Sequence, residues 1–339
     1  MSSTPTNTGP RTGLLARVDQ LAERLRSQPN PDPAAEAELV VLRNEAFGEL
    51  AERAQASAGE LPTVTDVSPP AASITAEDLV LTDRSASGLR RAFLTYGAAL
   101  LPQAIDRATV TTLVEGIDHA FEAFDASRSG NRQPEHQQWF VPFDPPGFDA
   151  EAKLRGWNRS GGGIWTTDSP RNHFLLLETL RTAGVVQLIT DYFGERPALS
   201  VDKSTLRRVP HDARTGDWHQ DGAFMGKGIR TVNVWLALTD CGVTAPGLDI
   251  VPRAMDLAET GTEGAHFDWA VGPGVVEKVA PPVEVLRPEF RAGDILLFDH
   301  LFLHRTGAEA ETMVNDRYAI ETWFFAPSCY PDTQLPIVV

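Results

Sequence analysis

Residues 218–239 read WHQDGAFMGKGIRTVNVWLALT, and this stretch decides the fold. Its second half, 231–239, is an apolar run rich in β-branched side chains, which predicts a buried strand. In the extended segment before that run, side chains alternate between two faces, so His219 and Asp221 point one way and Gln220 the other. A neighbouring imidazole and carboxylate supply two ligands for a metal ion, and a third must come from another strand.

The sequence holds a second His-x-Asp pair, so the pattern alone does not identify a site. His266 and Asp268 lie in a stretch rich in Gly and Thr, TGTEGAHFDWAVGPG, which predicts a loop. The pair at 219–221 is instead followed by the apolar strand. This context favours His219 and Asp221 as the metal ligands.

Residues 292–307, AGDILLFDHLFLHRTG, are the best source of the third ligand. A Gly-Asp turn opens an apolar strand, and two histidines follow it, His300 and His304. Either one can complete a set of two imidazoles and one carboxylate, which leaves three positions open on the metal. Such a set suits non-haem Fe(II), because a co-substrate and O₂ must bind the same ion.

Arg317 opens another alternating run, RYAIETWFF, at 317–325. A buried arginine on a core strand is costly unless it meets a carboxylate, which its planar guanidinium fits in a bidentate geometry. Two explanations stay open at this point. Arg317 binds an anionic ligand, or it forms an internal salt bridge with Glu321 or Asp294.

Composition limits the partners and the compartment. The chain has 339 residues and a formal net charge of −16, which argues against duplex nucleic acid as the main partner. No apolar run approaches the roughly 18 residues of a membrane span, and the N-terminal segment lacks the apolar core of a secretory signal. Two cysteines, Cys241 and Cys329, are too few for a zinc cluster or a disulfide framework. We therefore expect a cytoplasmic protein without nucleic-acid or membrane partners.

The chain divides into an extension, 1–73, and a main domain, 74–339. The extension shows two amphipathic helical patterns and ends in a proline-rich connector. Two short helices cannot bury both apolar stripes alone, so they dock on the main domain or on a second subunit, which allows a homodimer. In the main domain, short β-type runs between Gly/Pro turns predict an antiparallel barrel or sandwich. These runs are 199–209, 231–239, 247–252, 275–280, 283–287, 294–299 and 317–325.

Together the motifs resemble those of the phytanoyl-CoA dioxygenase (PhyH) family, over roughly residues 74–330. The resemblance implies an Fe(II)/2-oxoglutarate-dependent dioxygenase. It also implies a mainly β fold with flanking helices, namely a double-stranded β-helix (jelly-roll, cupin-like) core plus the N-terminal helical extension. The elements that carry it are HQD at 219–221, TVNVWLAL, APGLDIVPR at 245–253, AGDILLFD, LHRTG at 303–307, and Arg317.

The resemblance implies a role for each matching residue. His219, Asp221 and His304 would bind Fe(II), and the LHRTG context favours His304 over His300. Arg317 would bind the distal carboxylate of 2-oxoglutarate, with O₂ as the other co-substrate. Contacts to the co-substrate pocket are implied for Thr306, Trp235, Gln220, Ser204 and Thr205.

The resemblance to this family also bears on the reaction. Related halogenases have Gly or Ala where this chain has Asp221, so we expect hydroxylation or another oxidation of a small organic substrate, with formation of succinate. A cupin-like metal-dependent isomerase or oxygenase that does not use 2-oxoglutarate is an alternative that would not need Arg317. A non-catalytic barrel that binds a ligand is a second alternative, and it predicts a broken triad.

Two groups of residues bear on the substrate. Basic residues precede the metal motif and either keep an edge strand in solution or attract an anionic molecule. Aromatic residues in the loop-rich segment 125–170 either pack under the loops or contact an apolar substrate. The first group is Lys203, Arg207, Arg208, His211 and Arg214, and the second is Trp139, Phe140, Trp157 and Trp165.

Overall fold

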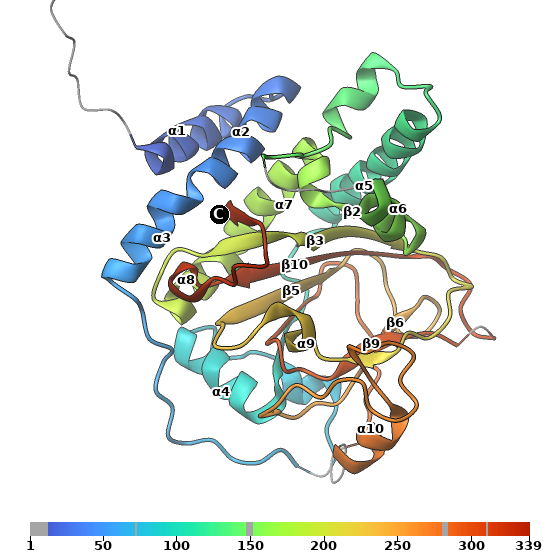
Figure 1. Cartoon of the computed structure of the whole chain (residues 1–339). Helices are drawn as coiled ribbons and strands as arrows, with labels where there is room; N and C mark the ends of the chain where they lie inside the picture. The colour runs from blue at the N-terminus through green and yellow to red at the C-terminus, as the bar shows by residue number, and fades with distance from the viewer. Residues whose placement is uncertain (1–12, 72, 147–151, 280–283, 310) are drawn as a thin grey trace, which may run out of the picture.

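Two antiparallel sheets form the centre of the molecule, as the computed structural model shows for residues 13–71, 73–146, 152–279, 284–309 and 311–339 (Figure 1). The seven-stranded sheet has the order β1-β8-β5-β10-β3-β11, with β2 paired to β3, and the four-stranded sheet has the order β6-β9-β4-β7. This is the predicted double-stranded β-helix.

The large sheet contains β1 (Ala98–Leu101), β2 (Gly163–Trp165), β3 (Ala198–Val209), β5 (Thr231–Ala237), β8 (Ile295–Phe298), β10 (Arg317–Phe325) and β11 (Pro336–Val338). The small sheet contains β4 (Trp218–His219), β6 (Gly247–Ile250), β7 (Ala270–Val271) and β9 (His304–Gly307).

The strand β5 shows why the large sheet has two different faces. Its residues Val232, Val234 and Leu236 belong to the core between the sheet and the helices. Trp235 and Ala237 belong to the core inside the barrel. The alternation follows from the period of two along a strand, and burial on both faces explains why the run is apolar throughout.

Four helices cover the outer face of the large sheet. Their apolar side chains share one core with the outward residues of β3, β5, β8 and β10. The helices are α4 (Ala86–Tyr96), α5 (Arg107–Arg128), α7 (Pro170–Thr182) and α8 (Val185–Phe193). With this face closed, the space between the two sheets is the interior available for a site.

The N-terminal extension docks on the main domain of the same chain. It forms α1 (Leu14–Arg26), α2 (Pro33–Glu45) and α3 (Phe47–Ala56), which lie against α7 and the C-terminal strand β11 (Figure 1). The Arg43 guanidinium donates to the carbonyl oxygen of Val338 over 2.6 Å. The apolar stripes are thus covered in cis, and a homodimer through this extension stays a prediction.

Three segments differ from the sequence expectation. Residues 275–280 were expected as a strand, but the helix α10 (Pro273–Val279) contains 275–279, and residue 280 lies outside the described residues; Pro273 suits a first helical turn, and Val276 is buried. The segment expected as loops contains α6 (Ala152–Ser160). Between the helices α4 and α5, the chain forms the strand β1, which was not among the expected strands and pairs with β8. No helix in the described part of the chain is long and apolar enough to cross a membrane.

Candidate metal centre and active-site cavity

Three predicted ligands meet at one point of the small sheet. His219 on β4 and His304 on β9 are directly paired across the two strands. Asp221 follows β4 at the start of α9 (Gly222–Met225), and one ligand atom from each of the three residues lies within 4.8 Å of the others. After Asp221 the backbone passes close to His300, where a glycine fits. The Gly222 amide donates to the His300 carbonyl oxygen over 2.7 Å, and a Cβ at position 222 would lie 2.9 Å from that oxygen.

The two imidazoles are oriented by backbone carbonyl groups. Nδ1 of His219 lies 2.9 Å from the carbonyl oxygen of Asp217, and Nδ1 of His304 lies 3.0 Å from that of Phe302. A carbonyl oxygen accepts, so each Nδ1 carries the proton and each Nε2 keeps its lone pair. On His304 that Nε2 lies 3.7 Å from Oδ2 of Asp221. Such bonds hold metal-binding histidines in a fixed tautomer and orientation.

The charge state of the triad fits a divalent cation. Burial raises the pKa of Asp221 to about 6 and lowers the pKa of His304 to about 3, so His304 is neutral at pH 7. Oδ2 of Asp221 is buried and accepts no hydrogen bond from any residue that the structure describes. A buried carboxylate oxygen without a donor is costly, and a cation between the three ligand atoms would satisfy it. Two imidazoles and one carboxylate form the donor set of a non-haem Fe(II) site.

The alternative ligands lie elsewhere. His300 contacts the Thr231 hydroxyl through Nδ1 over 3.2 Å and is not part of the triad. The second His-x-Asp pair is also separate, because His266 is exposed and pairs with Asp217 over 3.0 Å. The structure thus brings together His304 and the pair at 219–221.

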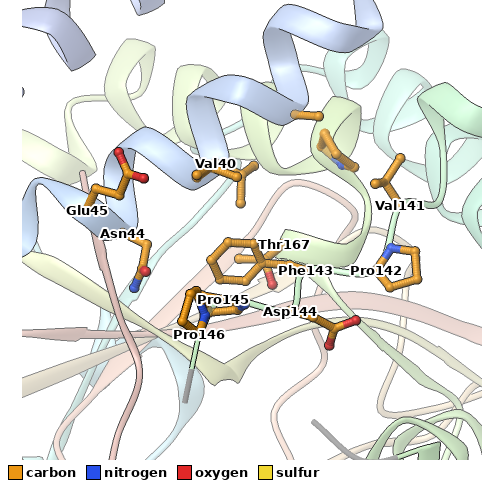
Figure 2. A pocket seen from close by; sticks show the side chains of 13 residues that line it. Val40, Asn44, Glu45, Val141, Pro142, Phe143, Asp144, Pro145, Pro146 and Thr167 are labelled. Atoms are coloured by element: carbon orange, nitrogen blue, oxygen red, sulfur yellow. The ribbon is translucent and has the colours of Figure 1, made fainter. Parts of the chain in front are cut away.

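A cavity of about 650 Å³ separates the two sheets beside the triad. Strands of both sheets line it: β3, β5, β8 and β10 from the large sheet, and β4, β6 and β9 from the small one. A smaller hollow of about 310 Å³ lies between α2 and residues 141–146 (Figure 2). It contains none of the predicted site residues, whereas the triad and Arg317 line the cavity between the sheets, which is therefore the candidate active site.

Arg317 faces this cavity and is 4% exposed. Its Nη1 donates to the Gly247 carbonyl oxygen over 3.0 Å, and its Nε has no partner. Within the described residues, neither internal acid considered from the sequence forms an ion pair with Arg317: Asp294 accepts from two backbone amides, and Glu321 lies instead 3.4 Å from Arg207. Burial lowers the pKa of Arg317 to about 10, so the side chain is still a cation at neutral pH.

Of the other predicted co-substrate contacts, three lie in the cavity wall. Trp235, on β5, packs on Phe290 with ring centroids 4.8 Å apart, and the Arg317 guanidinium lies 5.8 Å from its ring. Thr306 and Thr205 also line the cavity. These three surround the space between the triad and Arg317.

Two predicted contacts are placed elsewhere, because each points to the opposite face of its segment. Gln220 is fully buried, accepts from the Glu259 amide over 2.8 Å and donates to the Leu257 and Leu301 carbonyl groups. Ser204 is also buried, and its hydroxyl lies 2.6 Å from that of Thr322. Both residues hold the wall together from behind, and neither lines the cavity.

Trp269 and Glu321 were not placed in the active site from the sequence, but both line the cavity. The Trp269 ring meets the edge of His219 with centroids 5.6 Å apart, although it lies in the stretch expected to be a loop. Glu321 lines the cavity four residues after Arg317 on the same face of β10. Its position follows from the alternation of the strand, but Trp269 is brought in only by the pairing of β7 with β4.

The helix α6 forms part of the cavity rim and is anchored by arginines. Arg155 binds the buried carboxylate of Asp168 in a bidentate way, at 2.7 and 2.9 Å. Arg159 binds the more exposed Asp125 at 2.6 Å. These bonds hold Trp157, on the same helix, at the cavity.

The fold and the site define a jelly-roll protein with a candidate metal centre, and comparison with known proteins shows which family its central part is similar to. Residues 186–310 match the family model described as Phytanoyl-CoA dioxygenase (PhyH). The matched segment holds all three residues of the candidate metal centre. No curated protein matches the chain.

Three solved structures are similar to the chain. AviO1 from Streptomyces viridochromogenes Tue57 has 17% identity and a TM-score of 0.45, over 74% of this chain and 99% of that one. EctD from S. alaskensis, solved with 2-oxoglutarate and 5-hydroxyectoine, has 14% identity and a TM-score of 0.49, over 79% and 80%. The non-heme alpha ketoglutarate dependent carbocyclase SnoK from nogalamycin biosynthesis has 16% identity and a TM-score of 0.46, over 74% and 86%.

Proposed function

We propose that the protein is an Fe(II)- and 2-oxoglutarate-dependent dioxygenase that hydroxylates, or otherwise oxidises, an unactivated C–H bond of a small organic substrate. The observation that carries the proposal is the shared cavity, because the triad and the guanidinium of Arg317 line the same space from the two sheets. A dicarboxylate that chelates a metal through one end has a second carboxylate to place. Arg317 offers that carboxylate a buried cation with a free N–H.

Bound Fe(II) and 2-oxoglutarate would supply the oxidising chemistry, in which O₂ delivers one oxygen atom to the substrate and the other to the succinate formed with CO₂. His219, Asp221 and His304 would hold the ion from one side, and the carbonyl groups behind the two imidazoles keep their Nε2 atoms directed at it. Arg317 would bind the distal carboxylate. The barrel core around Trp235 would exclude water from the site.

The two alternatives account for fewer of these features. A metal-dependent isomerase or oxygenase without 2-oxoglutarate has no use for a buried, unpaired Arg317. A non-catalytic barrel has no use for the buried Asp221 oxygen that lacks a donor. Both features cost stability, and a metal with a chelating dicarboxylate would satisfy the two together.

Anaerobic addition of Fe(II) and 2-oxoglutarate tests the proposal. The wild-type protein should develop a charge-transfer absorption band in the visible region, and exposure to O₂ should then yield succinate. His219→Ala should abolish both signals, whereas His266→Ala, in the other His-x-Asp pair, should retain them. A wild-type protein that shows neither the band nor succinate would refute the proposed function.

A further inference from the structure

The inward face of β3 carries positive charge into the cavity. Lys203, Thr205 and Arg207 line it, whereas Ser204 is buried behind the wall and Arg208 faces outward to Asp118. The period of two along the strand therefore divides two adjacent arginines between the cavity and the outer surface. Of the basic stretch that the sequence analysis described, Lys203, Arg207 and Arg214 line the cavity.

These cations are weakly paired within the described parts of the chain. The Lys203 ammonium lies 3.9 Å from the centroid of the Phe224 ring, and no carboxylate lies within 4.0 Å of it. Arg207 reaches Glu321 only at 3.4 Å, longer than the roughly 2.7–2.9 Å of a good charge-assisted bond. Arg214 adds a third cation to the lining.

The balance of charge in this cavity opposes that of the whole chain. Apart from the triad and Arg317, the lining has three cations and the two acids Asp202 and Glu321. The chain as a whole carries −16. A local excess of cations in a concave site concentrates anions there.

Large apolar side chains surround the same space. Trp157 and Leu154, on α6, line the cavity and are 72% and 51% exposed. Trp269 and Phe224 line it further in, with ring centroids 6.0 Å apart. Exposed aromatic groups at the rim of a cavity indicate a surface that a ligand covers.

We infer that the cavity binds a substrate with a flat, apolar body and one anionic group. Lys203 and Arg207 would bind the anionic group, and Trp157, Trp269 and Phe224 would pack against the body. The inference deepens the proposed function, because it assigns the chemical class of the substrate of that enzyme. It also separates two anion sites in one cavity: Arg317 for the co-substrate and the β3 cations for the substrate.

Two fluorescent dyes that share one ring system isolate the anionic contribution. 1-Anilinonaphthalene-8-sulfonate has a sulfonate that N-phenyl-1-naphthylamine lacks. Their dissociation constants are measured on the full chain with Mn(II) and saturating 2-oxoglutarate, without Fe(II). We expect Lys203→Met and Arg207→Gln each to weaken binding of the sulfonate dye by about tenfold, since a bond to a charged group contributes that much or more. Binding of the neutral dye should change less than twofold.

Arg208→Gln is the matched control, because it removes the same charge from the other face of the strand, and both dyes should bind it as they bind the wild type. The inference is overturned if this control weakens the sulfonate dye as much as Arg207→Gln does, or if both dyes lose affinity equally. It is also overturned if 2-oxoglutarate displaces the sulfonate dye competitively, because the cations would then serve the co-substrate. Succinate formation by the wild type does not depend on these results, so a failure here is distinct from a failure of the proposed function.

Discussion

Replacement of Arg317 by methionine should separate ligand binding from stability, because none of the described residues forms an ion pair with this buried cation. Burial lowers the pKa of Arg317 from 12.5 to about 10. Below pH 10 the Arg317 side chain is protonated in both the folded and the unfolded chain. The full free-energy cost of burying its charge therefore acts at pH 7.5. At about 1.4 kcal/mol for each pKa unit, burial of the charge costs the fold about 3 kcal/mol.

Arg317→Met removes that penalty but leaves the Gly247 carbonyl oxygen without its donor, which costs about 1–2 kcal/mol. Without ligands, the unfolding temperature should therefore be unchanged or up to ~4 °C higher. With Mn(II) and 2-oxoglutarate each at about 100 times its dissociation constant, each ligand should stabilise the wild type by about 2.7 kcal/mol, or ~4 °C. The variant should lose the part of this gain that depends on 2-oxoglutarate and keep the part that depends on Mn(II).

Arg43 provides the control, because it is the other buried arginine of the same kind. Both side chains are 4% exposed, and burial also lowers the pKa of Arg43 to about 10. Arg43 also donates to one backbone carbonyl group and has an unpartnered Nε, but it lies outside the cavity. Differential scanning fluorimetry of Arg43→Met should show the full shift with 2-oxoglutarate. A large loss of stability in unliganded Arg317→Met, or an undiminished shift with 2-oxoglutarate, would refute the reasoning.

Three further predictions concern the metal, the rim helix and pH. His304→Ala should abolish binding of Mn(II) in isothermal titration calorimetry, whereas His300→Ala should bind it normally, since only His304 belongs to the triad. Arg155→Met should lower the unfolding temperature by ~4–7 °C, because it leaves a buried carboxylate unpaired at a cost of about 3–5 kcal/mol; Arg159→Met, which breaks a more exposed pair, should lower it by no more than ~2 °C. Burial raises the pKa of Asp299 to about 7, so this group lowers stability as the pH rises from about 4 to 7. Asp299→Asn should reduce that decline and raise the unfolding temperature at pH 8 by ~2–4 °C; an unchanged pH profile would contradict the assignment.

Local sequence carried the prediction of the metal ligands, because their arrangement depends on short-range geometry. The extended backbone at 219–221 puts His219 and Asp221 on one face, and the strand that ends before His304 supplies the third donor. The same alternation places Gln220 and Ser204 behind the cavity wall, so a role for either residue in the co-substrate pocket stays a prediction.

The sequence by itself determined the period-two strands, the pair at 219–221 and the presence of an arginine that needs an anion. Only the tertiary structure decided which groups Arg317 meets, because Asp294 and Glu321 became occupied through contacts with residues distant in the chain. Tertiary structure also decided which histidine completes the triad, since that depends on the pairing of β4 with β9. Spacing along a chain fixes the face on which a side chain lies, but the partner across the barrel depends on how the strands are paired, and that is set by the packing of the whole domain.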